Sequence, residues 1–176
     1  MKLKELISEK EIKNRVETLA GEIAEAFGEE PVTVVSLLKG AFIFTADVVR
    51  KLKNVELVEF VDVKSYKGMQ KGKTKIQFLK DLPAKGRNIL ILDDIFDTGE
   101  TLELVLREVE KGNPKKVKTC VLLDKDVEKR VCIYPDFVGF KIPNKFVVGY
   151  GLDYNELFRE LPYIAYIETE QESADG

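Results

Sequence analysis

Residues 88–102 read Asn-Ile-Leu-Ile-Leu-Asp-Asp-Ile-Phe-Asp-Thr-Gly-Glu-Thr-Leu, so that an apolar run meets three carboxylates. The run from Ile89 to Leu92 is continuous and rich in branched side chains, which is typical of a strand buried on both faces of a parallel sheet. Beyond the acids, apolar residues recur at helical spacing, at Leu102, Val105, Leu106 and Val109. The stretch therefore predicts a buried strand, an acidic turn and a helix, which is the repeating unit of α/β folds.

The acidic turn is the first candidate site. Asp93, Asp94 and Asp97 follow the apolar run, at the strand end where ligands bind in open α/β sheets. Free N–H groups at the helix N-terminus favour an anion, and Gly99 allows it to approach the backbone closely. The alternative is that Asp97 or Thr98 caps the helix and the other acids are solvated. Capping uses one side-chain oxygen and does not account for two adjacent carboxylates, so we expect a phosphate or sugar-phosphate site.

Length and composition narrow the function classes. A chain of 176 residues with 44% hydrophobic and 34% charged residues predicts one globular domain with a charged surface. The net charge of −3 argues against a general nucleic-acid or anionic-membrane binder. The sequence contains no histidine, which excludes Ser-His-Asp and Cys-His catalysis and leaves acid–base chemistry to Asp, Glu, Lys or Tyr.

Two further features bear on location. No window approaches the roughly 20 apolar residues of a membrane helix, and the first residues lack a signal-peptide core, so we expect a cytoplasmic protein without membrane contact. Cys120 and Cys132 are isolated in the sequence. They are predicted to be buried small hydrophobes rather than metal ligands or a disulfide.

Two other predicted strands end in a lysine. Residues 31–37 form an apolar run that is followed by Lys39-Gly40 and a helical pattern through Phe44, Val48 and Leu52. Residues 117–123 form another, and Lys125 follows it. Taken alone, these lysines fit ordinary turns or surface ion pairs, but beside the acidic turn the Lys39-Gly40 turn gains weight as a second anion site. Apolar residues near position 44 fit either the core or a subunit interface.

The remaining segments complete an alternation of strands and helices, as in a doubly wound sheet. Ser8-Glu9-Lys10-Glu11 is a capping box, and the helical face that follows ends at Gly28. Residues 56–64 alternate in polarity and residues 76–79 resume strand character, which predicts a hairpin with a mobile basic tip or, alternatively, a solvated loop. Residues 169–176 are acidic and small and are expected to form a frayed tail.

Four motifs resemble those of type I phosphoribosyltransferases, in particular the hypoxanthine-guanine enzymes. Residues 93–101, Asp-Asp-Ile-Phe-Asp-Thr-Gly-Glu-Thr, are similar to the family's signature for phosphoribosyl diphosphate (PRPP). Leu38-Lys39-Gly40-Ala41 resembles its pyrophosphate loop, in which the peptide before the lysine can be cis, and Ser65-Tyr66 resembles the start of its catalytic lid. Residues 147–156 closely match the carboxy-terminal motif, and Phe158-Arg159 extends it.

The resemblance, which spans about residues 34–167, implies a fold and an activity. The fold would be a single domain over residues 1–176: a mostly parallel twisted sheet flanked by helices, with a small hood, a flexible lid hairpin at about 65–75 and the acidic tail. The activity would be Mg²⁺-dependent transfer of phosphoribose from PRPP to N9 of hypoxanthine or guanine, giving IMP or GMP and pyrophosphate. Family members are dimers or tetramers and act without nucleic acid. The alternatives are a PRPP-fold regulator that binds nucleic acid, and a phosphoribosyltransferase that prefers xanthine.

The resemblance also implies roles for individual residues. For the sugar and metal, Asp93 and Asp94 would hold the ribose hydroxyls and help to place Mg²⁺, and Asp153 would bind a second Mg²⁺ near the base. For the phosphates, the implied ligands are Lys39, Gly40 and Arg159 for pyrophosphate and Asp97, Thr98, Gly99, Glu100 and Thr101 for the 5′-phosphate. For the base, Asp97 would be the general acid or base, and recognition would fall to Lys125, Phe146 and Val147. Ser65 and Tyr66 would act in the closed lid.

The sequence departs from the family pattern at two of these positions. Asp93 stands where the family usually has Glu, so we expect a bridging water or a shifted ribose. Glu100 adds a negative charge to a loop that should hold an anion, so its side chain is expected to point outward.

Overall fold

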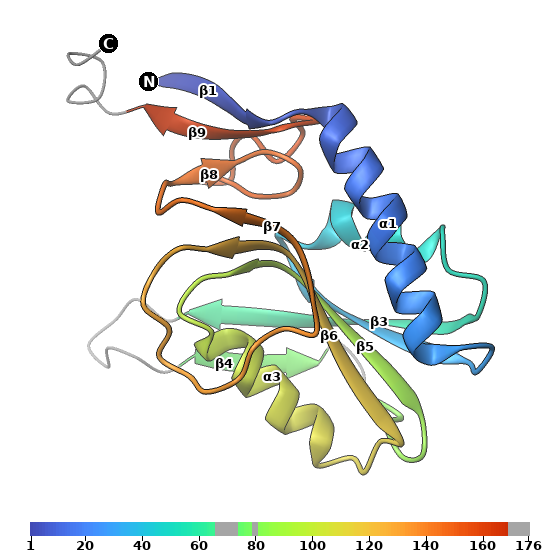
Figure 1. The fold of residues 1–176 in the computed structure, drawn as a ribbon. Coiled ribbons are helices and arrows are strands. Elements are labelled where there is room, and N and C mark those ends of the chain that lie inside the picture. Colours follow the sequence, from blue (N-terminus) through green and yellow to red (C-terminus); the bar gives the residue numbers. More distant parts are fainter. Residues whose placement is uncertain (66–73, 79–80, 169–176) are drawn as a thin grey trace.

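A six-stranded sheet forms the body of the protein (Figure 1). The computed structural model describes residues 1–65, 74–78 and 81–168. The strand order is β4-β3-β2-β5-β6-β7, with five parallel strands and an antiparallel β4 at the edge. The strands are β2 (Val32–Leu38), β3 (Val55–Ser65), β4 (Thr74–Phe78), β5 (Asn88–Phe96), β6 (Lys116–Lys125) and β7 (Phe137–Ile142). The predicted mostly parallel α/β sheet is confirmed.

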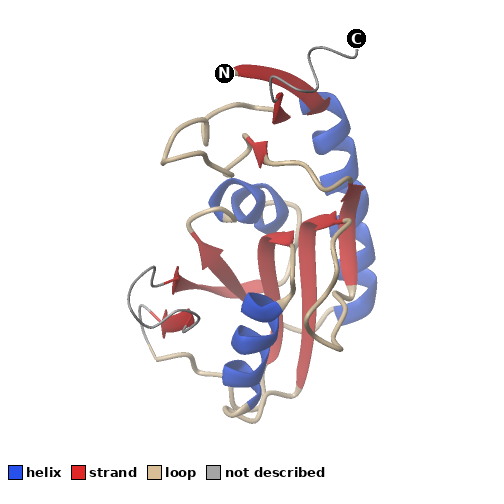
Figure 2. Ribbon diagram, turned by 90° about the vertical axis from the view of Figure 1, so that its left-hand side faces the viewer, coloured by secondary structure: helices blue, strands red, loops and turns tan. Residues whose placement is uncertain are grey.

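Helices cover both faces of this sheet. Figure 2 shows α1 (Glu9–Phe27) and α3 (Glu100–Glu110) on opposite sides of the strands. The burial of β5 follows this arrangement, because Leu90 and Leu92 join the core beneath α1 and α2 (Phe42–Val49). Ile89 and Ile91 alternate with them and join the core beneath α3. A strand covered on both faces needs apolar residues at every position, which explains the unbroken run that predicted it.

The predicted helix starts are confirmed in detail for α1. The Ser8 hydroxyl accepts a hydrogen bond from the Glu11 backbone at 3.2 Å, while the Glu11 carboxylate accepts one from the Ser8 N–H at 2.8 Å. In α2, Phe44 and Val48 are fully buried and belong to the core, whereas Phe42 is 44% exposed. Leu52 lies beyond the end of α2, so the predicted helix was too long there.

A second, smaller sheet forms a hood above one edge of the body (Figure 1). It contains β1 (Lys2–Ile7), β9 (Ile164–Glu168) and β8 (Val147–Val148), in that order and antiparallel. The sequence did not predict β1, because this strand is specified by its pairing with β9 near the other end of the chain rather than by a local pattern.

The structure corrects the prediction for one cysteine and confirms the predicted hairpin. Cys120 is buried as predicted, but Cys132 is exposed in the irregular segment between β6 and β7, so the prediction of a buried thiol there was wrong. The antiparallel pairing of β3 with β4 confirms the hairpin, whereas its predicted tip at residues 66–73 lies outside the described residues. None of the helices in the described ranges is long and apolar enough to cross a membrane.

Candidate active site

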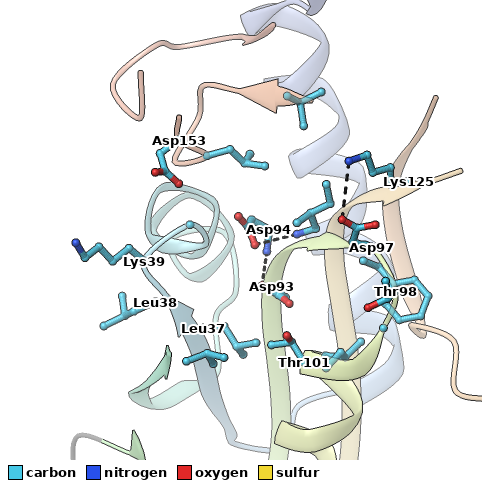
Figure 3. Close-up of a pocket in the computed structure, with 18 of the residues that line it drawn as sticks. Leu37, Leu38, Lys39, Asp93, Asp94, Asp97, Thr98, Thr101, Lys125 and Asp153 are labelled. Atoms are coloured by element: carbon cyan, nitrogen blue, oxygen red, sulfur yellow. Dashed lines mark hydrogen bonds and ion pairs between the residues drawn. The ribbon is translucent and has the colours of Figure 1, made fainter. Parts of the chain in front are cut away.

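One pocket of about 400 Å³ lies where β2, β5 and β6 end and where the hood faces them (Figure 3). Most of the predicted site residues line it, from both the body and the hood: Lys39, Gly40, Asp93, Asp94, Asp97, Thr98, Gly99, Thr101, Lys125, Phe146, Val147, Asp153 and Arg159. Of the predicted residues with described side chains, only Glu100 is outside the lining. Tyr66 and the side chain of Ser65 lie outside the described residues.

The pocket also contains apolar residues that the sequence did not indicate as site residues. They are Leu37, Leu38, Val63, Ile95, Phe96, Leu102 and Leu152. Ile95 is the clearest case, since it stands between the acid pair and Asp97 in the signature. The signal that could have identified it was an apolar pair, Ile95 and Phe96, flanked by acids at a strand end.

Asp93 and Asp94 lie within strand β5, because this strand is longer than predicted and continues through Phe96. Its pairing with β2 ends at Leu92, opposite Ser36, whereas its pairing with β6 continues to Phe96, opposite Asp124. Asp93 and Asp94 therefore stand on a part of β5 that pairs with β6 but not with β2, and both line the pocket. The prediction that the strand ended before the acids was wrong for this reason.

Asp93 is buried, with 6% of its surface exposed, and Asp94 is partly buried. Burial raises the pKa of Asp93 well above its usual value, and the negative charge of Asp94 raises it further. Burial also raises the pKa of Asp94. The Asp94 N–H donates to Asp93 at 2.9 Å, and the Ile95 N–H donates to Asp94 at 3.0 Å. Two adjacent carboxylates with little solvent are stabilised by an incoming cation, so this end of the pocket suits a metal ion or a positively charged sugar.

Two glycines let the Lys39-Gly40 loop, the acid pair and the hood approach closely. A Cβ at Gly40 would lie 1.9 Å from Oδ2 of Asp94. A Cβ at Gly151, where φ is +102°, would lie 2.2 Å from the Gly40 carbonyl oxygen. A side chain at either position is therefore incompatible with this packing. The Leu38–Lys39 peptide before this loop is cis, one of the two forms that the resemblance left open.

Ion pairs occupy the pocket edge next to Gly40, and they involve Lys39 from the body and charged residues from the hood. Lys39 pairs with Glu156 at 2.8 Å, and its side chain points away from the acid pair (Figure 3). Arg159 pairs with Asp153 at 3.2 Å and donates to the Gly151 carbonyl at 2.7 Å. Its Nε is buried without a hydrogen-bond partner among the described residues. Asp153 also accepts from the Glu156 N–H at 2.8 Å, so both of its oxygens are engaged.

The opposite edge of the pocket has the features of a site for a planar heterocycle. Lys125 Nζ lies 3.8 Å from Asp97 Oδ2 (Figure 3), and the lysine side chain is only 13% exposed. This burial removes the alternative of an ordinary surface ion pair for Lys125. The ring of Phe146 is 53% exposed and meets Tyr154 edge to face, with 5.7 Å between ring centroids. An uncovered aromatic face beside a cation and a carboxylate can stack and orient a polar heterocycle.

The turn after β5 leads into α3 through Gly99. Gly99 is the N-cap residue, with φ +91°, and within the described residues no side chain caps this helix. The alternative role of Asp97 or Thr98 as the cap is therefore wrong. The first N–H groups of α3 remain available to an anion. Glu100 is exposed, accepts from the Thr98 hydroxyl at 3.1 Å and pairs with Arg130 at 3.5 Å, so its charge is held outside the pocket lining.

Known proteins share this fold and sequence along nearly the whole chain. The model of the phosphoribosyl transferase domain family matches residues 3–155. The hypoxanthine-guanine phosphoribosyltransferase of Aquifex aeolicus is 48% identical over 171 residues, which cover 95% of this chain and 96% of the relative. A solved structure of Trypanosoma cruzi hypoxanthine phosphoribosyltransferase with the product IMP is 38% identical, covers 94% of both chains and has a TM-score of 0.83. A second structure of that enzyme, from work on how the C-terminal region affects its oligomeric state and activity, has a TM-score of 0.87, 35% identity and coverage of 98% of this chain and 94% of the other.

Proposed function

The chain belongs to the phosphoribosyltransferase family, and we propose that it acts in purine salvage by transferring phosphoribose from PRPP to N9 of hypoxanthine or guanine. The products are IMP or GMP and pyrophosphate. One observation carries this proposal: a largely buried acid pair, the helix that begins after Gly99 and the Lys125–Asp97 pair line a single pocket. These three features match the sugar, the 5′-phosphate and the base of one nucleotide.

The sugar end of the pocket stabilises the positive charge of the transition state. As the bond from the anomeric carbon to pyrophosphate breaks, positive charge develops on the ribose, and fixed carboxylates stabilise it. Asp93 and Asp94 hold the ribose hydroxyls and supply that negative charge. Lys39 and Arg159 turn from Glu156 and Asp153 to the leaving pyrophosphate, for which the free Nε of Arg159 is a further donor.

The base end of the pocket supplies the acid–base step. When N9 attacks the anomeric carbon, the purine imidazole must lose a proton, and Asp97 accepts it. Lys125 donates to the 6-oxo oxygen, Phe146 stacks on the ring and the Val147 backbone meets the base edge. Because an ammonium group cannot accept a hydrogen bond, a 6-amino purine loses this contact and is rejected.

The acid pair also fits Mg²⁺. No cluster of three or more acidic, Cys or His side chains capable of holding a metal occurs among the described residues. Mg²⁺ does not need one, since it commonly takes one or two carboxylates and completes its shell with water and substrate phosphates. Asp93 and Asp94 would hold it, and Asp153 would become free for a second ion when Arg159 turns to pyrophosphate. When bound, Mg²⁺ neutralises diphosphate charge.

Removal of the metal is expected to abolish most of the activity. Metal stabilisation of a leaving group is worth several kcal/mol, so excess EDTA should lower the rate of IMP formation at least about 100-fold. The measurement is nucleotide formation from PRPP and hypoxanthine before and after chelation. Re-addition of excess Mg²⁺ is the control and should restore the rate. Undiminished turnover in EDTA would show that the acid pair acts without a metal.

The proposed function is tested with a panel of bases. Purified protein with PRPP and Mg²⁺ should convert hypoxanthine and guanine, and adenine at least about 100-fold more slowly, because the donor Lys125 is left facing an amino group. Chromatography of the nucleotide products is the measurement. Faster conversion of xanthine than of hypoxanthine would favour the xanthine alternative. No conversion of any base, together with PRPP-sensitive RNA retention on filters, would favour the regulatory alternative.

The proposal includes a cytoplasmic homodimer or homotetramer. Support for the compartment is the pair of free cysteines, one buried and one exposed, which persist where thiols stay reduced. Support for assembly is limited to the relatives, among which the oligomeric state of the T. cruzi enzyme has been connected with its C-terminal region.

A further inference from the structure

Lys129 joins the ends of the two strands that carry the base site, although none of the contacts proposed above involves it. Its ammonium group donates to the Lys125 carbonyl at 2.6 Å and to the Phe96 carbonyl at 3.2 Å. It also pairs with Asp124 at 2.8 Å. The lysine side chain is 23% exposed and that of Asp124 only 10%, so these contacts are partly shielded from water.

The same ammonium group belongs to a closed set of contacts around the Phe96 ring. It lies 4.7 Å from the centroid of that ring, which is within the range of a cation–π interaction. The ring of Tyr134 meets Phe96 edge to face at 5.8 Å, and the Tyr134 hydroxyl donates to Asp124 at 2.6 Å. That hydrogen bond raises the pKa of Tyr134 to about 12, so the hydroxyl remains a donor at neutral pH. Lys129, Asp124, Tyr134 and Phe96 therefore hold one another.

The contacts around Phe96 lie next to the residues that would bind the base. Phe96 directly precedes Asp97, and Phe96 is the last residue of β5 in register with β6, opposite Asp124. Beyond that point the sheet no longer fixes how far Asp97 stands from Lys125. The two hydrogen bonds of Lys129, one to each strand end, take over this task.

We propose that Lys129 is a positioning residue for base recognition, which holds Asp97 and Lys125 at the separation that the two edges of the purine require. This proposal rests on the proposed function, because it assigns the base to the space between Asp97 and Lys125. Lys129 itself touches neither substrate. Its effect should be larger at the base end than at the pyrophosphate end, since Lys39 and Arg159, which hold the pyrophosphate, lie on other segments.

A matched control exists at the opposite end of the sheet. Lys116, the first residue of β6, donates to the Ala26 carbonyl at 3.1 Å and lies 5.7 Å from the centroid of the Phe27 ring. It thus makes the same kinds of contact as Lys129, a backbone hydrogen bond and a ring contact, but far from the pocket. A role that is only structural predicts similar effects of substitution at both lysines.

The test compares Lys129→Met, Lys129→Arg and Lys116→Met with the wild-type enzyme. For Lys129→Met we expect KM for hypoxanthine to rise about 10-fold while KM for PRPP changes less than about 2-fold, because small displacements of positioned groups have large effects. Lys129→Arg keeps the charge and the donors and should restore most of the base affinity. Lys116→Met should leave both constants unchanged.

Three outcomes would overturn the proposal: unchanged constants in Lys129→Met, an equal rise of both constants, or an equal effect of Lys116→Met. If Lys129→Met does not fold, Lys129→Gln, which keeps a polar side chain but removes the charge, replaces it and must show the same selective rise in KM for hypoxanthine. A wild-type enzyme that does not use hypoxanthine would refute the proposed function and this proposal together. Normal wild-type kinetics with an unaffected Lys129 variant would refute the role of Lys129 alone.

Discussion

Asp97→Asn is expected to lower kcat with hypoxanthine by about 100-fold to 10,000-fold, the range typical for loss of a general acid or base. The substitution keeps the size and shape of the side chain, but an amide cannot accept the imidazole proton. Asp97 follows the end of β5, and its carboxylate lies 3.8 Å from Lys125 and is half exposed, so the change buries no new polar group. The fold should therefore survive, and the loss should lie in the chemical step.

The measurement must isolate that step, because product release limits kcat in many enzymes. Single-turnover formation of IMP, with enzyme in excess over PRPP, reports the chemistry directly. Glu108→Gln is the control: it makes the same chemical change on α3, where Glu108 pairs with Lys111 away from the pocket, and should keep wild-type turnover. Wild-type single-turnover rates in Asp97→Asn would mean that another group accepts the proton.

Local patterns predicted the part of the site that local structure builds. The acid pair, Gly99 and Thr101 belong to one strand–turn–helix unit, and each of their positions follows from the sequence around it. The role of Lys125 was harder to predict, because the prediction depended on a family resemblance rather than on the residues around it. The burial of this lysine depends on the position of β6 between β5 and β7, which no pattern near residue 125 encodes.

Contacts between distant segments were not predictable in this way. The hood needs β1 to pair with β9, for example Leu3 with Ile167, and a short strand with little alternation gives no local sign of such a partner. The approach of Gly151 to Gly40 likewise joins the hood to the body across more than 100 residues. Lys129 was not predicted for the same reason. In the sequence it is one charged residue among several, and its proposed role depends on two carbonyls of different strands.

The length of β5 illustrates why strand ends are the least certain part of a prediction. Polar residues at positions 93 and 94 suggested that the strand had ended, since carboxylates are rarely buried without partners. The ladder to β6 nevertheless continues past them. Burial of Asp93 beside a second carboxylate costs free energy, and a cation bound there would offset that cost. Local propensity and the observed structure disagree at this position for that reason.

Lys125→Met is expected to lower kcat/KM for hypoxanthine roughly 10-fold to 100-fold, because a hydrogen bond from a charged group contributes about 1.5 to 3 kcal/mol. Methionine keeps the apolar stem, and the site is well shielded, with the lysine side chain 13% exposed. The variant should also lose discrimination. Without an ammonium group facing position 6, the pocket no longer rejects an amino group there, so kcat/KM for adenine should fall less than that for hypoxanthine, or rise.

The ratio of the two specificity constants is the decisive measurement, because a general loss of structure lowers both alike. Lys118→Met is the matched control: Lys118 lies on the same strand and pairs with Asp136 at 3.0 Å, away from the pocket, so the hypoxanthine-to-adenine ratio should stay at the wild-type value. An unchanged ratio in Lys125→Met would remove Lys125 from base recognition. Selectivity would then have to come from the Val147 backbone, whose N–H and carbonyl are present in every variant.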